Sequence, residues 1–411
     1  MKFLRNIFEK LEPAAKKNKY LHTTYDAFYT FFFVPGHVTH GGTHIKDGMD
    51  IKRTMVLVVL AMQLCLLFGM WNVGHWHYAA YGQYVGYEEG FIQKFLFGFL
   101  QVLPIVIVAH VVGLGIEFIF AAIKRHQVEE GFLVTGMLIP LIMPPDIPLW
   151  MVAMATAFSV IIAKEAFGGT GMNILNIALT ARVFVFFAYP TYISGDLAWI
   201  TWDTNILHDL VGLGATVDLY GVDNAIQGFT GATPLGLASA GMEVNGVTLA
   251  GIDAVTHNYT WWEMFIGFIP GSIGETSKLA ILMGIGLLVV SQVGSWRIML
   301  SMFLGALLMG LLFNLIGANP FLEVPWYYHL VMGGFLFALA YMATDPVTAA
   351  QTNPGKWVFG FLCGVVGMIV RVLNPAFPEG WMLAILLMNV FAPLIDHVVI
   401  QMNIKKRLAR G

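Results

Sequence analysis

Charged residues are scarce in this sequence of 411 residues. Asp, Glu, Lys and Arg together make up 11% of the chain, whereas 57% of it is hydrophobic. A soluble domain carries about 25% charged residues, so this chain has too little charge to cover soluble domains of its length. The shortage excludes a cytoplasmic globular enzyme, a disordered protein and a nucleic-acid binder. A membrane protein with several spans remains.

Cysteine pairs, a signal peptide and a dinucleotide-binding motif are also missing. Cys65 and Cys363 are the only cysteines and form no CxxC pair, which excludes a cysteine-ligated zinc or iron–sulfur site within the chain. Residues 1–53 are basic and aromatic without an apolar core, so we expect no cleavable signal. There is no strand–GxGxxG–helix unit, and the chain also lacks the soluble α/β surface that such a unit needs, so we expect no dinucleotide-binding domain within it.

Long apolar runs make up much of the sequence. A helix needs about 20 apolar residues to cross about 30 Å of hydrocarbon. The candidate spans are residues 54–73, 96–122, 131–144, 148–163, 172–189, 275–294, 298–316, 327–343, 357–373 and 380–402. The sequence therefore predicts an all-α integral membrane protein with about ten transmembrane helices.

The basic residues predict the orientation of these spans. Nine of the 22 Lys and Arg residues lie in residues 1–53, and four more lie after residue 404. Residues 189–262 contain no Lys or Arg but seven Asp or Glu. Since basic residues collect on the cytoplasmic side, we expect both termini to be cytoplasmic and residues 189–262 to face outward.

This distribution divides the chain into five parts. They are an amphipathic N-terminal region (1–53), a first set of five helices (54–188), an outward-facing loop (189–262), a second set of five helices (263–402) and a basic tail (403–411). The N-terminal region carries apolar residues at helical spacing beside basic ones. This pattern favours a helix that lies on the cytoplasmic membrane face or packs against a partner protein, and it leaves both open.

Two short segments resemble each other. Residues 143–148 and 342–347 both contain Met-x-x-Asp, ending in Asp146 and Asp345, and each precedes a span. Because five spans is an odd number, a repeat of this kind has two halves of opposite orientation, as in many transporters with broken helices. The alternative is a chance match in an apolar background.

Some charged residues lie within predicted spans, where charge is costly and marks either a functional site or a structural pair, and four of them are the clear cases. They are Glu117, Arg182, Glu275 and Asp396. Cation handling and interhelical ion pairing, for instance between Arg182 and an acidic neighbour, are both compatible with the pattern.

The outward-facing loop contains a glycine-rich turn with two hydroxyl groups. It runs Thr230-Gly231-Ala232-Thr233-Pro234 and is flanked by Gly228 and Gly236. Glycine allows a close approach of the backbone to a ligand, and free amides in such a turn can hold an anion. Physical reasoning alone goes no further than this.

The motif, its position and the rest of the chain resemble one membrane family. [ST]-G-A-T in an outward-facing segment is similar to the flavin-attachment motif of the family that contains the B-type subunit of the Na⁺-translocating NADH:quinone reductase and the D-type subunit of the Rnf complex. Residues 167–173 and 271–277 and Asp396 add to the likeness. The long basic N-terminal region resembles the quinone-reductase member more than the shorter Rnf one.

The resemblance implies a fold and a first cofactor. The fold is a ten-helix inverted repeat similar to that of urea transporters. The hydroxyl of Thr233 is expected to form a phosphoester with FMN, and Thr230, Gly231, Ala232 and Pro234 complete the motif.

The resemblance also implies a noncovalent riboflavin, for which Gly168, Gly169, Asn173 and Asn176 are candidates. Ile177 stands where the family pattern leads us to expect proline after Asn176. Ubiquinone is expected as substrate near the cytoplasmic side. The resemblance further implies a six-subunit complex, with partners of the A, C, D, E and F type, in the lipid of a bacterial inner membrane, with residues 189–262 in the periplasm.

Outward transport of Na⁺ completes the implied function, with no other metal. Reduction of a flavin or quinone adds negative charge, which raises the affinity for a nearby cation. The candidate carboxylates for the ion path are Asp396, Glu275, Asp345, Asp146 and Glu117.

Three other functions stay open at this stage. One is an Rnf-type subunit of an ion-translocating ferredoxin:NAD complex. The second is a passive channel or secondary transporter on a urea-transporter-like scaffold, without redox function. The third is a quinone-site scaffold without a cofactor of its own. In-gel flavin fluorescence that depends on Thr233 separates the flavin-bearing proteins from the others.

Overall fold

The computed structural model describes residues 2–15, 25, 29, 33, 41–42, 51–124, 131–195, 197–202, 204–213, 231–244, 246–374 and 377–410. Within the attachment motif, Thr230 therefore lies outside the described residues, whereas Gly231 to Pro234 lie within them.

The first half of the chain is helical. Its helices are α1 (Lys2–Ala15), α3 (Ile51–Ala80), α4 (Phe91–Lys124), α5 (Phe132–Leu141), α6 (Leu149–Ser159) and α7 (Ile177–Ala188). Helix α6 continues through a π-helical turn, η1 (Val160–Lys164), and a 3₁₀ turn, η2 (Glu165–Phe167). Turns of the π type inside helices are frequent at functional sites.

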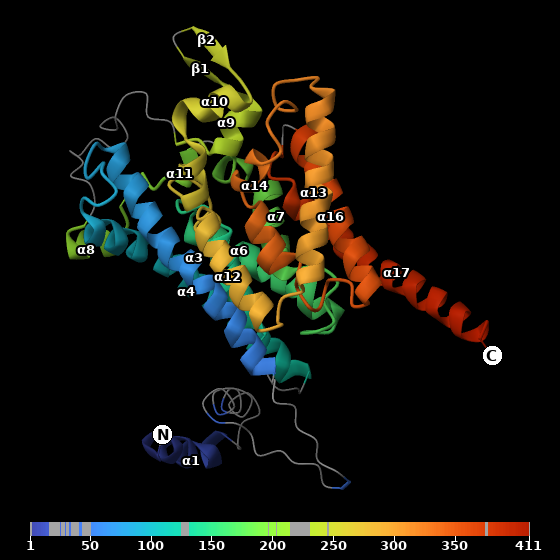
Figure 1. Cartoon of the computed structure of the whole chain (residues 1–411). Coiled ribbons are helices and arrows are strands. Elements are labelled where there is room, and N and C mark those ends of the chain that lie inside the picture. Colours follow the sequence, from blue (N-terminus) through green and yellow to red (C-terminus); the bar gives the residue numbers. More distant parts are fainter. Residues whose placement is uncertain are drawn as a thin grey trace.

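The predicted outward-facing loop has structure of its own. It contains η3 (Pro190–Tyr192), η4 (Leu197–Trp199), α8 (Ile206–Val211), α9 (Pro234–Ala240), β1 (Met242–Val244), β2 (Val247–Leu249), α10 (Ile252–Asn258) and α11 (Trp261–Ile266). The two strands form an antiparallel hairpin in which Met242 pairs with Leu249. This short hairpin is not predicted by the sequence, but the described part of the protein is otherwise helical as expected; the hairpin lies at the end of the molecule opposite to α1 (Figure 1).

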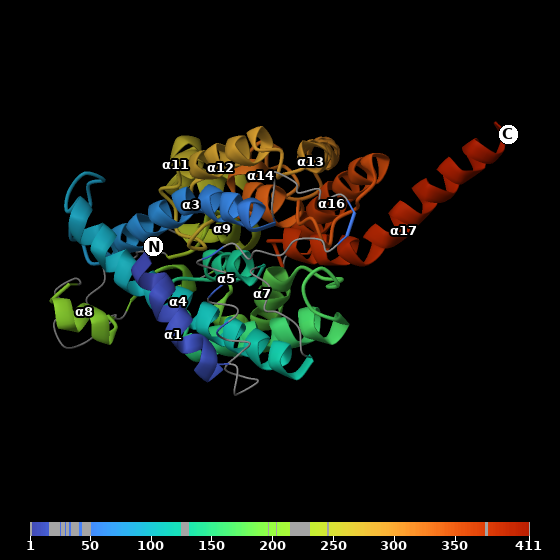
Figure 2. The same cartoon turned by 90° about the horizontal axis from the view of Figure 1, so that it is seen from below.

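The second half contains α12 (Lys278–Val290), α13 (Trp296–Ile316), α14 (Tyr328–Val331), α15 (Phe335–Phe337), η6 (Ala338–Met342, π-helical), α16 (Asn353–Leu373) and α17 (Trp381–Leu408). Helices α13 and α16 pack closely at Gly305. The backbone of Phe361 comes so near that a Cβ atom on Gly305 would lie 2.3 Å from its carbonyl oxygen. Small residues at such crossings are typical of membrane helices. The C-terminal half of α17 extends away from the body (Figure 2).

Six helical segments in the described part of the chain are long and apolar enough to cross a membrane. They are Arg53–Ala80, Phe91–Lys124, Leu149–Phe167, Trp296–Ile316, Asn353–Leu373 and Trp381–Leu408. Helices α5, α7 and α12 are apolar but shorter. The protein is thus a helical, multi-pass membrane protein, whereas ten crossings and the inverted repeat stay predictions.

Three predicted spans are shorter or more broken than expected, because polar side chains and glycine interrupt them. Helix α7 begins only at Ile177, where the side chain of Asn176 accepts a hydrogen bond from the Leu179 amide at 3.1 Å. Ser277 caps α12 in the same way. Between α14 and α15 the chain turns at Gly333, which has a φ of 65°.

Candidate functional site

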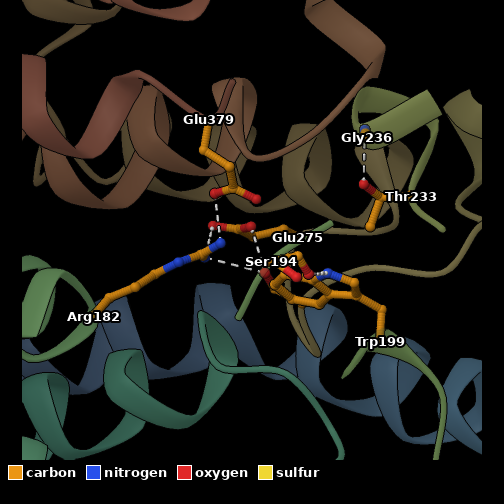
Figure 3. Close-up of polar contacts among 8 residues, drawn as sticks. Arg182, Ser194, Trp199, Thr233, Gly236, Glu275 and Glu379 are labelled. Carbon is orange, nitrogen blue, oxygen red and sulfur yellow. Dashed lines mark hydrogen bonds and ion pairs between the residues drawn. The ribbon is translucent and has the colours of Figure 1, made fainter. Parts of the chain in front are cut away.

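Thr233 is the first residue of the candidate site and stands at the N-terminus of α9. Its hydroxyl oxygen Oγ1 accepts a hydrogen bond from the amide of Gly236 at 3.0 Å (Figure 3). Its own amide donates to the carbonyl oxygen of Gly195 at 3.0 Å. Pro234, whose ring suits the first position of a helix, follows directly. Two backbone contacts therefore hold Thr233 in one place.

Two glycines leave room beside this hydroxyl. A Cβ on Gly236 would lie 3.2 Å from Thr233 Oγ1 and 3.0 Å from the Gly195 carbonyl oxygen. A Cβ on Gly195 would lie 3.1 Å from the Gly236 Cα and 3.6 Å from the same hydroxyl. We refer to Gly195 and Gly236 as the glycine cradle of Thr233. A side chain at Gly236 would crowd Oγ1, and one at Gly195 would crowd the backbone of Gly236.

Thr233 lines a cavity of about 240 Å³, called here the Thr233 cavity. Phe186, Trp199 and Phe377 contribute aromatic surface, and Arg182 and Glu379 contribute the charged groups of its wall. Its lining comes from α7, the loop region and the segment before α17. The cavity is therefore largely apolar with one defined charged edge.

Arg182 forms this charged edge together with two carboxylates. Its Nη1 donates to Glu275 Oε1 at 3.1 Å, and its Nη2 donates to Glu379 Oε2 (Figure 3). Glu275 also accepts a hydrogen bond from the Ser272 hydroxyl at 2.7 Å, and Arg182 lies 5.7 Å from the centre of the Trp199 ring. The pairing expected for Arg182 is thus present, with two partners instead of one.

Two further buried basic side chains lie close to these acids. Lys278 Nζ donates to the carbonyl oxygens of Glu275 at 2.6 Å and of Thr276 at 3.2 Å. Arg371 interacts electrostatically with Glu275 and Glu379 and donates through Nη1 to two backbone carbonyls. Its Nε and Nη2 have no hydrogen-bond partner among the described residues. Three basic groups and two acidic ones give this cluster a formal charge of +1.

A second cavity of about 150 Å³ contains another set of candidates, and we name it the Asp345 cavity. Asn173, Asn176, Tyr341, Asp345 and Lys164 line it, along with apolar residues of α3, α5 and α12. Asp345 Oδ2 accepts hydrogen bonds from Asn176 Nδ2 at 3.4 Å and from the Thr348 hydroxyl at 3.0 Å. Both halves of the chain meet here.

Lys164, at the end of the π turn, is the cation of the Asp345 cavity. It is buried and forms an ion pair with the equally buried Glu117 of α4. Because an unpaired charge inside a protein is costly, each of the two groups fixes the other. Glu117 is thus engaged in a pair beside the cavity, next to the predicted flavin residues.

The other predicted residues lie apart from the two cavities. Asp396 accepts hydrogen bonds from the amides of Gln351 and Thr352, at 2.6 and 3.0 Å, before the first turn of α16. Asp146 is half-buried in the turn before α6. Gly168 and Gly169 adopt left-handed backbone conformations after η2 and do not line the Asp345 cavity. The five predicted ion-path carboxylates therefore do not form one cluster: Glu117 and Asp345 lie at the Asp345 cavity, and the other three lie elsewhere.

Sequence reasoning missed several residues of the two cavities. Glu379, Trp199 and Gly195 belong to the Thr233 cavity, and Lys164 belongs to the Asp345 cavity. The one signal available was charge beside an apolar segment, since Lys164 directly follows a predicted span and Glu379 directly precedes another.

Comparisons with known proteins support the resemblance over the whole chain. Residues 38–405 match the sequence model of the "NQR2, RnfD, RnfE family". The chain is 45% identical to the B-type subunit of the Na(+)-translocating NADH-quinone reductase of Ectopseudomonas mendocina, with 100% of this chain and 98% of that protein covered. Proteins of the same name from Pseudomonas aeruginosa (43% identical, 99% of each chain covered) and Chromohalobacter salexigens (44% identical, 99% and 96% covered) are also similar. The chain therefore belongs to the NQR2, RnfD, RnfE family.

Proposed function

We propose that this chain is the B-type membrane subunit of a Na⁺-translocating NADH:ubiquinone reductase in a bacterial inner membrane. Full-length relatives of 43 to 45% identity that carry this name support the proposal. In the proposed topology both termini are cytoplasmic and residues 189–262 are periplasmic. The remaining subunits, of the A, C, D, E and F type, supply the NADH chemistry for which this sequence has no motif.

In this proposal FMN is attached through its phosphate to the hydroxyl of Thr233. The observation that carries it is the glycine cradle, which keeps space open at Oγ1 in a cavity with aromatic walls. Phe186, Trp199 and Phe377 suit a flat ring system, and Arg182 suits the negative charge of the phosphate or of the reduced ring. The residues present therefore fit the group.

Riboflavin is assigned to the Asp345 cavity. The amides of Asn173 and Asn176 and the carboxylate of Asp345 offer the hydrogen-bond donors and acceptors that the polar edge of a flavin needs, and the opposite wall is apolar. Gly168 and Gly169 shape the turn that leads into this wall. When bound, the two flavins carry electrons from other subunits towards ubiquinone.

Na⁺ is the transported substrate, and as a hard cation it prefers oxygen ligands, among which carboxylates also supply the opposite charge. Glu275 pairs with Arg182 of the Thr233 cavity, Glu117 pairs with Lys164 of the Asp345 cavity, and Asp345 lines the latter, so the charge of a reduced cofactor in either cavity acts on nearby carboxylates. Asp396 and Asp146 lie elsewhere and are proposed as outer parts of the path. Replacing each acid by its amide and measuring Na⁺-dependent turnover tests these assignments.

The attachment site is tested by in-gel fluorescence of the full-length chain from a host that has the flavin transferase. We expect a fluorescent band at the mass of this chain, absent in Thr233→Ala and restored at least in part in Thr233→Ser. Thr248→Ala is the matched control, because Thr248 is an exposed threonine of the hairpin in the same loop region. Fluorescence in Thr233→Ala equal to that of the unaltered chain would contradict the proposal.

A second measurement separates the proposed function from that of an Rnf-type relative and from a channel. NADH-driven ubiquinone reduction by the complex should require Na⁺. Turnover that depends on ferredoxin would favour the Rnf-type function. Flavin-independent solute flux through the chain alone would favour a channel.

A further inference from the structure

We infer that Arg182 sets the redox potential of the flavin attached to Thr233, and that Glu275 and Glu379 position it and oppose its charge. The inference rests on the proposed attachment of flavin at Thr233. It concerns a cluster of charges that the attachment motif does not contain and that joins three distant parts of the chain.

Arg182 and Glu379 line the same cavity as Thr233, so a group joined to the Thr233 hydroxyl within that cavity shares its walls with both charges. Arg182 is 2% exposed and lies in the interior of the protein, beside a largely apolar cavity wall. Charges in such a setting interact more strongly than they do in water, because the effective dielectric constant is lower. The guanidinium is therefore placed to act on the charge of the attached group.

The two acids differ in where their charge lies. Glu275 is buried, and its carboxylate is engaged by both Ser272 and Arg182. The side chain of Glu379 is 22% exposed, lines the Thr233 cavity and pairs with Arg182. Glu275 thus mainly holds the guanidinium in place, whereas Glu379 places a negative charge on the wall of the cavity.

The sign of the effect follows from the electron that reduction adds to the flavin. A nearby positive charge favours the reduced form and raises the potential, whereas a negative charge lowers it. Removing the charge of Glu379 should therefore raise the potential, and removing that of Arg182 should lower it. Removing both leaves the formal charge of the cluster at +1, so the two shifts should largely cancel.

The test is a spectroscopic redox titration of the purified full-length chain, produced together with the flavin transferase. Dithionite is oxidised and the flavin is reduced; no bond of the protein changes. The spectrum of Thr233→Ala is subtracted to remove flavin bound elsewhere. Each variant is first checked for in-gel flavin fluorescence, so that loss of attachment, which bears on the proposed function, is distinguished from an unchanged potential.

We expect Glu379→Gln to raise the reduced-to-oxidised ratio at a fixed ambient potential about tenfold, which corresponds to about 59 mV for a one-electron step. Arg182→Gln should lower this ratio at least tenfold. Arg182→Lys should give a ratio near that of the unaltered chain, and the double variant Arg182→Gln/Glu379→Gln should bring the ratio back towards that value. Glu323→Gln is the control, since this exposed carboxylate lines neither cavity.

Shifts of opposite sign in Glu379→Gln and Arg182→Gln are the result that a purely structural role does not produce, because both changes break the same ion pair and a structural defect would move the potential in the same direction. If Arg182→Gln alone fails to fold or to carry flavin, Glu379→Gln and the double variant decide. Fluorescent Glu379→Gln with an unchanged or lowered potential overturns the inference while leaving the attachment intact. A non-fluorescent unaltered chain overturns the proposed function instead.

Discussion

The Thr233 cavity and the Asp345 cavity are built from similar parts but differ in how each can hold a ligand. Each draws residues from both halves of the chain and has a buried base paired with acids, Arg182 in one and Lys164 in the other. The Thr233 cavity adds a hydroxyl in a glycine cradle. The Asp345 cavity instead has amides and a carboxylate that are already hydrogen-bonded to their neighbours.

This difference separates two ways of holding a cofactor. A covalent bond needs one accessible oxygen and space, and it makes few demands on the rest of the wall. Noncovalent binding is stronger when several polar side chains are held in place by their own hydrogen bonds, because these side chains then lose little conformational freedom on binding. We propose that the Thr233 cavity holds a covalently attached cofactor and that the Asp345 cavity holds a cofactor by noncovalent contacts.

The largest effect is expected from breaking the buried ion pair beside the Asp345 cavity. Lys164→Ala removes one member of this buried pair and keeps the Glu117 carboxylate buried, and a change of this kind costs about 3–5 kcal/mol of stability. Thermal denaturation of the detergent-solubilised chain measures this. The double change Lys164→Met/Glu117→Gln should recover most of the loss, and a double variant as unstable as Lys164→Ala would argue against the pair.

Filling the glycine cradle should affect only the Thr233 cavity. Gly236→Val places methyl groups where a Cβ already lies 3.2 Å from Thr233 Oγ1, and overpacking of this kind costs about 1–3 kcal/mol. We expect covalent flavin to fall about tenfold or more, with noncovalent flavin unchanged. Gly286→Ala, where a Cβ meets nothing within 4 Å, serves as control. Full attachment in Gly236→Val would mean that the cradle is not needed.

The reverse selectivity is expected for the Asp345 cavity. Asp345→Asn removes the charge that Asn176 and Thr348 now contact, and hydrogen bonds to charged groups contribute about 1.5–3 kcal/mol. Extractable, noncovalent flavin should therefore fall about tenfold, while the in-gel fluorescence at Thr233 persists. Equal loss of both flavins would show that the two cavities do not act separately.

The smallest effect should come from a helix cap away from both cavities. Thr260 and Glu263 form a capping box at α11, in which the Thr260 amide donates to Glu263 Oε2 at 2.8 Å. Thr260→Ala should cost about 1 kcal/mol and change the content of neither flavin. A loss of either flavin in this variant would show that helix α11 affects the corresponding cavity, although Thr260 lines neither of them.

The sequence alone predicts the helices well, since each of the ten predicted spans contains helical structure. It predicts their ends less well, because those depend on single polar side chains. Asn176 falls inside the predicted span 172–189 but caps α7, and this cap starts the helix at Ile177 although the expected proline is absent.

The charged walls could not be foreseen, because they form between residues far apart in the chain. Glu379 follows Pro378 and precedes Gly380, a pattern typical of a loop, yet it pairs with Arg182, 197 positions away. In the sequence Gly195 cannot be distinguished from other turn glycines, and only the structure shows that it lies against Gly236. By contrast, Thr233 is predicted from a local motif together with a family resemblance, both of which can be read without knowledge of the fold, and its role stays a prediction.

Our central claim is that Thr233, and no other hydroxyl, carries a flavin through a phosphoester. Mass spectrometry of the proteolytic peptide that contains Thr230 and Thr233 tests it most directly. We predict a peptide heavier by one esterified FMN, with fragment ions that place the group on Thr233. An unmodified peptide from a host that has the transferase, or fragments that place the flavin on Thr230, would contradict it.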